Sequence, residues 1–244
     1  TYPAQVQALL QSAPPEYRYS VFQAVDLFWL AVDSGELEQA KNQLAVATQR
    51  GLDSSSLIEL QAYWFQVSNQ FADSIASYQQ ALKLRPSVTS RYNLALSYWW
   101  NSDLTQAKQQ LLQVLAITAD YKYATQLLAS IYLLQGDVSS AVTSYQEIVA
   151  KNPQSIDLSN LSLAYALLGE DQKALKFATM AVEKSPGHPT WLLNLADAQA
   201  ISGLTQQAQK NYQQVISLHQ GKADLKSWLE RAQAYVHTGA DEAA

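Results

Sequence analysis

The stretch "YATQLLASIYLLQGDVSSAVTSYQEIVAKNP" (residues 123–153) decides the fold. In its first half, apolar residues recur at three- and four-residue spacing, as Leu128 and Tyr132 do. The same period resumes in the second half with Ala141 and Tyr145. Spacing of this kind places apolar side chains on one face of a helix, so the stretch predicts two consecutive amphipathic helices.

The same pattern occurs six times along the chain without internal gaps. Successive copies begin 33 or 34 residues apart. A period of this length indicates an array of similar supersecondary units, each too small to bury its own apolar face. The copies are "LFWLAVDSGELEQAKNQLAVA" (27–47), "QAYWFQVSNQFADSIASYQQA" (61–81), "LALSYWWNSDLTQAKQQLLQV" (94–114), "LASIYLLQGDVSSAVTSYQEI" (128–148), "LSLAYALLGEDQKALKFATMA" (161–181) and "LADAQAISGLTQQAQKNYQQV" (195–215).

The residues that begin and end the helices repeat as well. Asp103 and Asp137 follow the turn between two helices, where a carboxylate can cap the second helix. Pro86, Pro153 and Pro186 follow the second helix of three copies, which a proline cannot continue. The turn itself is predicted to need a left-handed backbone conformation, which suits glycine and asparagine best. The residues at that position are Gly35, Asn69, Ser102, Gly136, Gly169 and Gly203.

Small residues occupy one fixed position in each helix of the pair. Short side chains there let two helix backbones approach closely, and neighbouring tyrosines fill the remaining space. These columns are Ala62, Ala95, Ala129, Ser162 and Ala196 in the first helices, and Ala40, Ala107, Ala141, Ala174 and Ala208 in the second.

The order of large, small, aromatic, glycine, alanine and proline positions resembles the tetratricopeptide repeat (TPR) family, whose unit has about 34 residues. The resemblance covers residues 21–222. It implies an all-α fold, a right-handed superhelical solenoid of helix-turn-helix repeats in which the first helices line a concave wall. The predicted repeats are residues 21–54, 55–87, 88–121, 122–154, 155–188 and 189–222.

The residues outside the repeats are predicted to flank or cap the array. Residues 1–20 form an N-terminal flank or cap, with a short helix at 4–11 that "APPEY" (13–17) breaks. Residues 223–238 form a C-terminal capping helix, followed by a tail at 239–244. In the capping helix, we expect Leu225, Trp228, Leu229 and Ala232 to face the array, and Lys226, Glu230 and Arg231 to face water.

Composition narrows the class of partner. The chain has 244 residues, of which 48% are apolar and 15% charged, and its formal net charge is −5. Without a basic stripe, a nucleic-acid or anionic-membrane partner is not expected. No apolar run approaches the roughly 18 residues of a membrane span, so direct membrane insertion is not expected either.

The reactive residues of the sequence do not form a pattern that is typical of an enzyme or of a cofactor site. The chain has no cysteine, which excludes disulfides and thiolate metal sites. The three histidines lie in different parts of the predicted array: His188 and His219 in the fifth and sixth repeats, and His237 in the capping helix. None of them has a second ligand at metal-binding spacing. "HQGKAD" (219–224) lacks the glycine and Ser/Thr of a phosphate loop. We therefore predict no catalytic residue, no metal and no cofactor.

Helical-wheel geometry predicts a concave groove. At about 100° per residue, Trp99 lies at the shoulder toward an adjacent repeat and Trp100 points into the groove. The same wheel adds Phe22, Val25, Val67, Leu133, Leu134, Leu163 and Asp197. The predicted partner-binding residues are Trp29, Tyr63, Tyr92, Asn93, Leu96, Trp99, Trp100, Tyr123, Gln126, Asn160 and Asn194.

Three alternatives to an open groove stay open. The aromatic residues, Trp29 and Trp99 above all, can serve only as packing between repeats. Residues 1–20 can fold back into the groove. A second copy of the chain can close over it, which would make the protein a homodimer.

Asn93, Asn160 and Asn194 occupy equivalent places in three repeats. An asparagine offers both a donor and an acceptor to an extended peptide backbone. The arrangement resembles the asparagine ladder in the repeats of protein O-GlcNAc transferases. The resemblance to co-chaperones that clamp a terminal carboxylate fails, because this wall lacks groove lysines and arginines.

The sequence thus predicts a non-enzymatic scaffold that binds another protein or a peptide segment in an aromatic groove. The alternative is the TPR arm of a larger enzyme, or of a bacterial envelope apparatus that exports polysaccharide or protein or assembles pili. The chain begins at Thr1 rather than at Met, as expected of a processed protein or an excised part of a longer one. A low-lysine, glutamine-rich, cysteine-free composition favours the bacterial periplasm or cell envelope.

Overall fold

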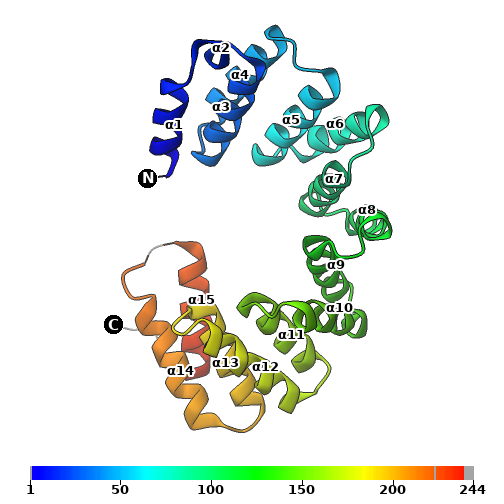
Figure 1. Ribbon diagram of the computed structural model, residues 1–244. Coiled ribbons are helices and arrows are strands. Elements are labelled where there is room, and N and C mark those ends of the chain that lie inside the picture. The colour runs from blue at the N-terminus through cyan, green and yellow to red at the C-terminus, as the bar shows by residue number, and fades with distance from the viewer. Residues whose placement is uncertain (1, 223, 239–244) are drawn as a thin grey trace. The chain divides into compact units, whose positions relative to one another are not determined.

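The computed structural model describes residues 2–222 and 224–238, and the regular secondary structure of these residues is entirely helical (Figure 1). The all-α prediction is therefore confirmed. The predicted tail at 239–244 lies outside the described residues. The chain divides into two compact units, Thr1–Tyr121 and Lys122–Ala244, a division that the repeat pattern did not predict.

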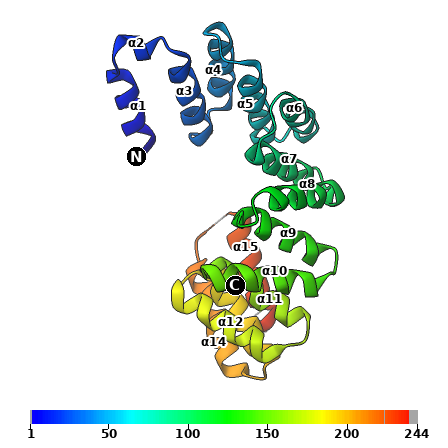
Figure 2. The ribbon, with the colours of Figure 1, turned by 45° about the vertical axis from the view of Figure 1, so that its right-hand side comes forward.

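The N-terminal unit packs its helices in chain order. From α3 to α8, each helix packs against the next, and α1 and α2 contact α3. Figure 2 shows α1 lying alongside α3. The helices are α1 (Tyr2–Ser12), α2 (Pro15–Arg18), α3 (Val21–Asp33), α4 (Leu37–Gln49), α5 (Ser54–Val67), α6 (Phe71–Leu84), α7 (Val88–Trp100) and α8 (Leu104–Ile117).

The C-terminal unit repeats this arrangement. Consecutive helices from α9 to α15 pack on one another, and first helices of neighbouring repeats, such as α11 and α13, also touch. Each predicted repeat range corresponds to one helix pair, except that α5 begins at Ser54, one residue before the range 55–87. The helices of this unit are α9 (Lys122–Leu134), α10 (Val138–Lys151), α11 (Ser155–Leu167), α12 (Asp171–Lys184), α13 (Pro189–Ile201), α14 (Thr205–Leu218) and α15 (Leu225–Thr238).

The turns between paired helices have the predicted left-handed backbone. Asn69 and Ser102 have φ values of 59° and 63°, and Gly136 has 77°. Beyond the turn, the Asp103 carboxylate accepts a hydrogen bond from a backbone N–H two residues into α8, at 3.0 Å. Asp137 caps α10 in the same way at 3.2 Å. The φ values confirm the predicted turn residues, and the two hydrogen bonds confirm the predicted caps. Each cap satisfies a backbone N–H that the start of a helix leaves without an intrahelical partner.

The N-terminal flank differs slightly from prediction. The helix expected at 4–11 is present as α1, but the break at 13–17 is shorter than expected. A second short helix, α2, begins at Pro15. Proline is tolerated at the first helical position, because the N–H that it lacks has no intrahelical partner there.

The small-residue columns lie at the helix contacts as predicted. All ten side chains are buried, with exposed fractions of 0 to 3%. Ser162 adds a hydrogen bond from its hydroxyl to the carbonyl of Ala174, at 2.7 Å. In the second repeat, Ser74 takes the alanine position and donates to the carbonyl of Ala62 at 2.9 Å. A buried hydroxyl therefore replaces a methyl group without leaving a polar atom unpaired.

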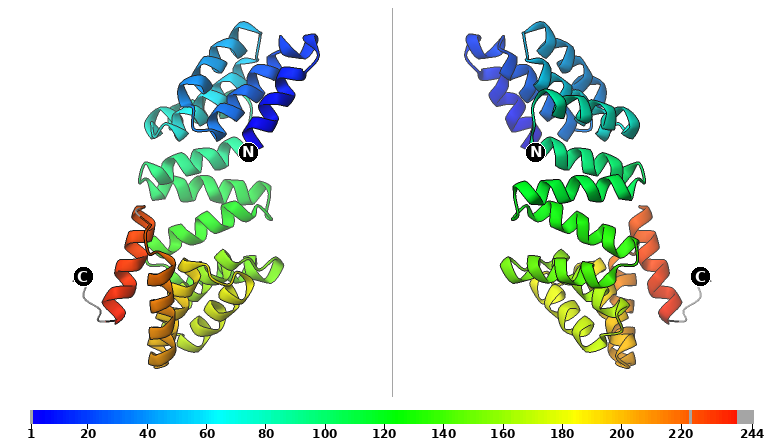
Figure 3. Two further views of the ribbon diagram at one scale, coloured as in Figure 1. Left: turned by 90° about the vertical axis from the view of Figure 1, so that its left-hand side faces the viewer. Right: turned by 90° about the vertical axis from the view of Figure 1, so that its right-hand side faces the viewer.

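The predicted orientation of the capping helix is wrong for most of the residues named, although Lys226 is exposed as expected. Leu225, Trp228 and Leu229 are 71%, 47% and 52% exposed, whereas Glu230 is only 8% exposed. Ala232 is partly buried. Figure 3 shows α15 beside α14. The face that packs on the last repeat is therefore not the apolar stripe of the helical wheel.

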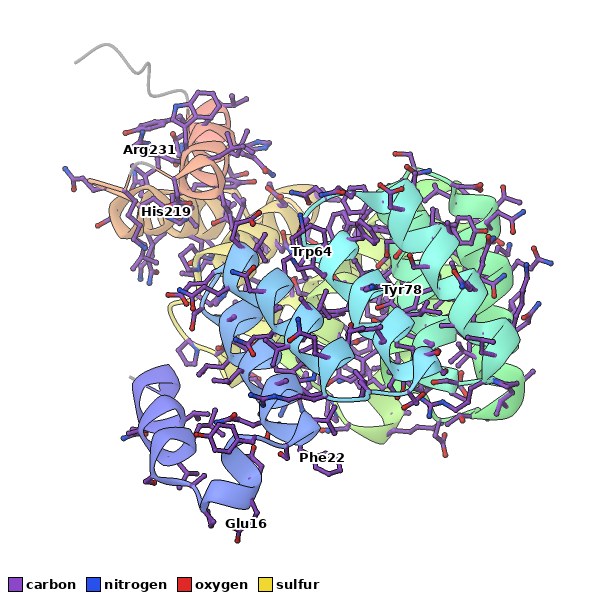
Figure 4. All side chains as sticks on the ribbon, turned by 90° about the horizontal axis from the view of Figure 1, so that it is seen from above. Glu16, Phe22, Trp64, Tyr78, His219 and Arg231 are labelled. Atoms are coloured by element: carbon purple, nitrogen blue, oxygen red, sulfur yellow. The ribbon has the colours of Figure 1, made fainter. Side chains whose placement is uncertain are left out.

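The reason is a buried polar cluster. The Glu230 carboxylate lies 2.7 Å from His219 Nε2 and accepts a hydrogen bond from Thr190 Oγ1 at 2.6 Å. Figure 4 shows His219 at this end of the unit. Hydrogen bonds to a charged group are stronger than neutral ones, and they require one orientation of the helix. This orientation leaves the apolar stripe exposed.

Candidate functional site

A cavity of about 500 Å³ lies in the N-terminal unit between the first helices of three repeats. We call it the N-terminal cavity. Its volume falls within the range of ordinary ligand pockets, about 300 to 1,000 Å³. Five residues placed in the groove by the helical wheel meet here. The lining residues are Phe22, Val25 and Trp29 of α3; Leu52; Ser56, Glu59, Leu60 and Tyr63 of α5; Tyr78 of α6; and Ser87, Thr89, Ser90 and Asn93 in or beside α7.

Aromatic side chains form one wall of the N-terminal cavity. The Trp29 ring packs on Tyr63 with a centroid distance of 4.8 Å, and on the buried Phe28 at 5.2 Å. Trp29 is still 38% exposed, and Phe22 is 70% exposed. Figure 4 shows Phe22 projecting from α3. Trp29 thus contributes both to packing between repeats and to an accessible apolar surface, which proteins usually cover with a partner.

Polar side chains of α5 and α7 also line the N-terminal cavity. The Glu59 carboxylate accepts a hydrogen bond from Ser90 Oγ at 2.8 Å and lies 3.3 Å from the Arg85 guanidinium. Arg85 also donates to Ser56 Oγ at 3.1 Å. Sequence reasoning missed this cluster. Glu59 lies four residues before Tyr63 on the same helix, a spacing that puts both side chains on one face.

Burial raises the pKa values of the two tyrosine hydroxyls at this site. It raises the pKa of Tyr63, and the negative charge of Asp33 adds to this effect. It also raises the pKa of Tyr78, an effect that the nearby Asn93 side chain partly opposes. Both phenols therefore stay neutral near pH 7 and retain a hydroxyl that can donate a hydrogen bond.

The other predicted groove residues of this unit do not line the N-terminal cavity. Trp100 is 58% exposed, and its ring stacks on Phe71 of α6 with a centroid distance of 6.4 Å. The Tyr92 ring lies 5.2 Å from that of Tyr121. Trp99 and Leu96 are partly buried. The role of these four residues in binding stays a prediction.

The N-terminal flank lies next to α3 but not in the N-terminal cavity. A separate cavity of about 610 Å³ separates α1 from α3, with Leu9, Leu10 and Trp29 among its lining residues. The Tyr17 hydroxyl donates a hydrogen bond to the Asp26 carboxylate, which raises the pKa of Tyr17 to about 12. These contacts place the flank against the first repeat.

Gln126, whose role in partner binding stays a prediction, contacts a buried carboxylate within the C-terminal unit. Its amide donates a hydrogen bond to Asp157, whose side chain is fully buried. Lys122 Nζ lies 2.7 Å from the same carboxylate. A buried charge requires such pairing, and these two contacts link α9 to α11.

The asparagines of the C-terminal unit make contacts of the same kind. Asn194 donates a hydrogen bond to Ser159 Oγ at 2.6 Å. Burial raises the pKa of Tyr145, and the side chains of Ser130 and Asn160 lower it in part. Tyr123 is 64% exposed. Asn160 and Asn194 thus contact neighbouring repeats, and their role in a peptide ladder stays a prediction.

In residues 2–222 and 224–238, no helix is long and apolar enough to cross a bilayer. Nor does this part of the chain bring together three His, Cys, Asp or Glu side chains that could hold a metal ion.

A family model described as tetratricopeptide repeat matches residues 59–122, 92–156 and 127–189. These overlapping matches cover more than half of the chain. The chain belongs to the tetratricopeptide repeat family. The TPR repeats imply a protein-interaction scaffold, and members of the family are generally non-catalytic.

Solved structures show the same fold. A TPR protein from Parabacteroides merdae is 16% identical, with a TM-score of 0.67 over 91% of this chain and 94% of that one. PilW, a type IV pilus biogenesis factor, is 17% identical, with a TM-score of 0.68 over 78% and 89%. In the Cut9–Hcn1 structure, the match is 11% identical, with a TM-score of 0.74 over 95% of this chain but 46% of that one.

These identities show likeness of fold alone. The TPR chain spans less than half the length of the chain that it matches in the Cut9–Hcn1 structure. A comparison with curated proteins finds no significant match.

Proposed function

We propose that this TPR chain binds a partner polypeptide in the N-terminal cavity. The observation that carries the proposal is the wall of Phe22, Trp29 and Tyr63, which leaves aromatic surface accessible beside a cavity of about 500 Å³. Apolar side chains of a partner would cover these rings, and aromatic anchors dominate binding energy in such interfaces. The Glu59 cluster would give the polar edge that orients the partner.

The size and composition of the cavity favour a peptide segment. The lining combines apolar rings with hydroxyl and amide groups of Ser56, Thr89 and Asn93. These groups can donate to and accept from a peptide backbone, whereas the rings take side chains. No reactive constellation accompanies them, so binding without catalysis is the function that the lining supports.

The test is selection of binders from a random displayed 12-residue peptide library on the full chain. Enriched peptides are then measured by fluorescence anisotropy against Phe22→Ala. Because Phe22 is 70% exposed, this change should leave the melting temperature unaltered. A hot-spot aromatic is worth about 2 kcal/mol or more, so we expect affinity to fall roughly 30-fold.

Trp228→Ala is the matched control, since Trp228 is an exposed aromatic residue of α15 that is not among the predicted groove residues and does not line the N-terminal cavity. It should leave the affinity of these peptides unchanged. A library that yields no binder, or peptides that lose affinity on Trp228→Ala but not on Phe22→Ala, would refute the proposed site.

A second candidate is that the chain is one arm of a bacterial envelope assembly. Its low-lysine, cysteine-free composition and its likeness of fold to PilW support this proposal. Fractionation of the source cells tests it. Recovery in the periplasm or envelope is expected, and recovery with the cytosol would reject it.

A further inference from the structure

A second cavity, of about 310 Å³, lies in the C-terminal unit. We call it the C-terminal cavity. The helices α11 and α13 form its walls, and α14 and α15 each add a side chain. Its lining residues are Ser162, Leu163, Ala166 and Leu167 of α11; Asn194, Asp197, Ala198, Ala200 and Ile201 of α13; Tyr212 of α14; and His237 of α15.

Asp197 holds a carboxylate in this mostly apolar lining. One of its oxygens accepts a hydrogen bond from the Tyr212 hydroxyl at 2.6 Å, and the other accepts one from Gln233 Nε2 at 3.0 Å. The nearest basic group on the lining is His237, whose Nε2 lies 3.9 Å away. The described lining contains neither lysine nor arginine. A carboxylate offers about four acceptor positions, so part of its capacity stays unused.

The two hydrogen-bond donors to Asp197, Tyr212 and Gln233, are neutral, so they do not by themselves require a carboxylate at this position. An asparagine could accept from Tyr212 and, after the amide of the exposed Gln233 flips, pair with it as well. Burial raises the pKa of Asp197, and the hydrogen bond from Tyr212, the nearby His237 and the hydrogen bond from Gln233 oppose this only in part. The negative charge therefore costs free energy in the free protein, a cost that a bound cation would offset.

The apolar walls of the C-terminal cavity indicate that the part of the ligand beyond its charged group is aliphatic. Leu163, Leu167 and Ile201 are 48%, 58% and 53% exposed. Lysine and arginine side chains bury their aliphatic stems along such surfaces while their cationic heads meet a charge. A cavity of this kind suits a long basic side chain better than a small inorganic cation, which would leave the walls uncovered.

We propose that the C-terminal cavity binds a lysine or arginine side chain of a partner polypeptide. The aliphatic stem lies along Leu163, Leu167 and Ile201, and the cationic head pairs with Asp197. The proposal shares with the proposed function the premise that the chain binds polypeptides. It uses a different cavity, so either proposal can fail alone.

The test uses the full isotope-labelled chain and the peptide Ac-Ala-Leu-Lys-Leu-Ala-NH2, followed by amide NMR spectra. The lysine peptide should shift amide signals of α13 and α15 around Asp197. The analogue with norleucine in place of lysine should bind at least tenfold more weakly. n-Butylammonium, which has the head and stem alone, should shift the same signals at higher concentration.

Three variants make the test specific. Asp197→Asn should weaken the lysine peptide at least tenfold. Leu167→Lys should weaken it too, because Leu167 is exposed and a lysine there can reach the carboxylate as an internal competitor. Phe22→Ala, in the N-terminal cavity, should leave this titration unchanged, so failure here is distinguishable from failure of the proposed function.

Equal binding of the lysine and norleucine peptides, or no localised shift with either, would overturn the proposal. Equal binding to wild type and to a folded Asp197→Asn would do so as well. Binding of n-butylammonium without any binding of the lysine peptide would reject a polypeptide as the occupant.

Discussion

Removal of the Glu230 carboxylate should release α15 from the last repeat. The structure pairs this side chain with His219 and Thr190 at 2.7 and 2.6 Å, and the Glu230 side chain is only 10% exposed. Hydrogen bonds to a charged group contribute roughly 1.5 to 3 kcal/mol each. Because some water can reach the vacated site, we expect Glu230→Ala to lower the free energy of opening of α15 by about 2 to 4 kcal/mol.

Leu225→Ala is the contrasting variant. A leucine packed against the array would cost about 2 to 5 kcal/mol on truncation, but Leu225 is 71% exposed. We expect its loss to cost less than about 1 kcal/mol. Glu230→Gln keeps the shape and one hydrogen bond, so its effect should lie between the two.

Native-state hydrogen exchange of the α15 amides measures this difference. In a repeat array, loss of a terminal contact acts on the terminal element rather than on the whole chain. At about 1.4 kcal/mol per tenfold, exchange in α15 should accelerate roughly 30- to 700-fold in Glu230→Ala and less than about fivefold in Leu225→Ala. If Leu225→Ala accelerates exchange more than Glu230→Ala, the helix packs through its apolar stripe and the polar-cluster explanation is wrong.

Three further outcomes are expected. Lys122→Met should destabilise the C-terminal unit by about 3 kcal/mol or more in thermal melting, because it leaves the buried Asp157 carboxylate without its cation; unchanged melting would contradict this. Ser102→Gly should stabilise the N-terminal unit by roughly 0.5 to 1 kcal/mol, since φ is 63° at this turn, and a loss of stability would show that the serine side chain matters. Asp197→Asn should change the pH dependence of stability. The raised pKa of Asp197 means that its contribution to stability is fully present below the ordinary value of 3.8 and is lost as pH rises through the raised value. Melting temperatures of the variant relative to wild type should therefore increase from about pH 4 upward and then level off, whereas a constant difference would contradict the shift.

Much of the fold was readable from local patterns. The turn at Gly136, the cap at Asp137 and the buried column that includes Ala129 each depend on residues within one helical hairpin. Helical periodicity, backbone sterics and capping act over three or four residues, and the repeat shows the same signals many times. The aromatic wall of Phe22, Trp29 and Tyr63 followed from the same wheel.

The sites depended on contacts between residues far apart in the chain. Gln126 pairs with Asp157, which lies 31 residues away, a contact that the helical wheel did not predict. Glu59 accepts a hydrogen bond in the N-terminal cavity from Ser90, which is also 31 residues away. Periodicity assigns a polar residue to a face, but it does not say which polar group on the next helix that residue meets.

The sequence by itself determined that the chain is a TPR array, where each hairpin turns and which residues pack within a pair. Only the tertiary structure decided the orientation of α15 and the surroundings of Asp197. A helical wheel ranks faces by hydrophobicity, whereas a buried carboxylate with two good partners, as at Glu230, can outweigh that ranking. Such partners are known only once the helices are packed together.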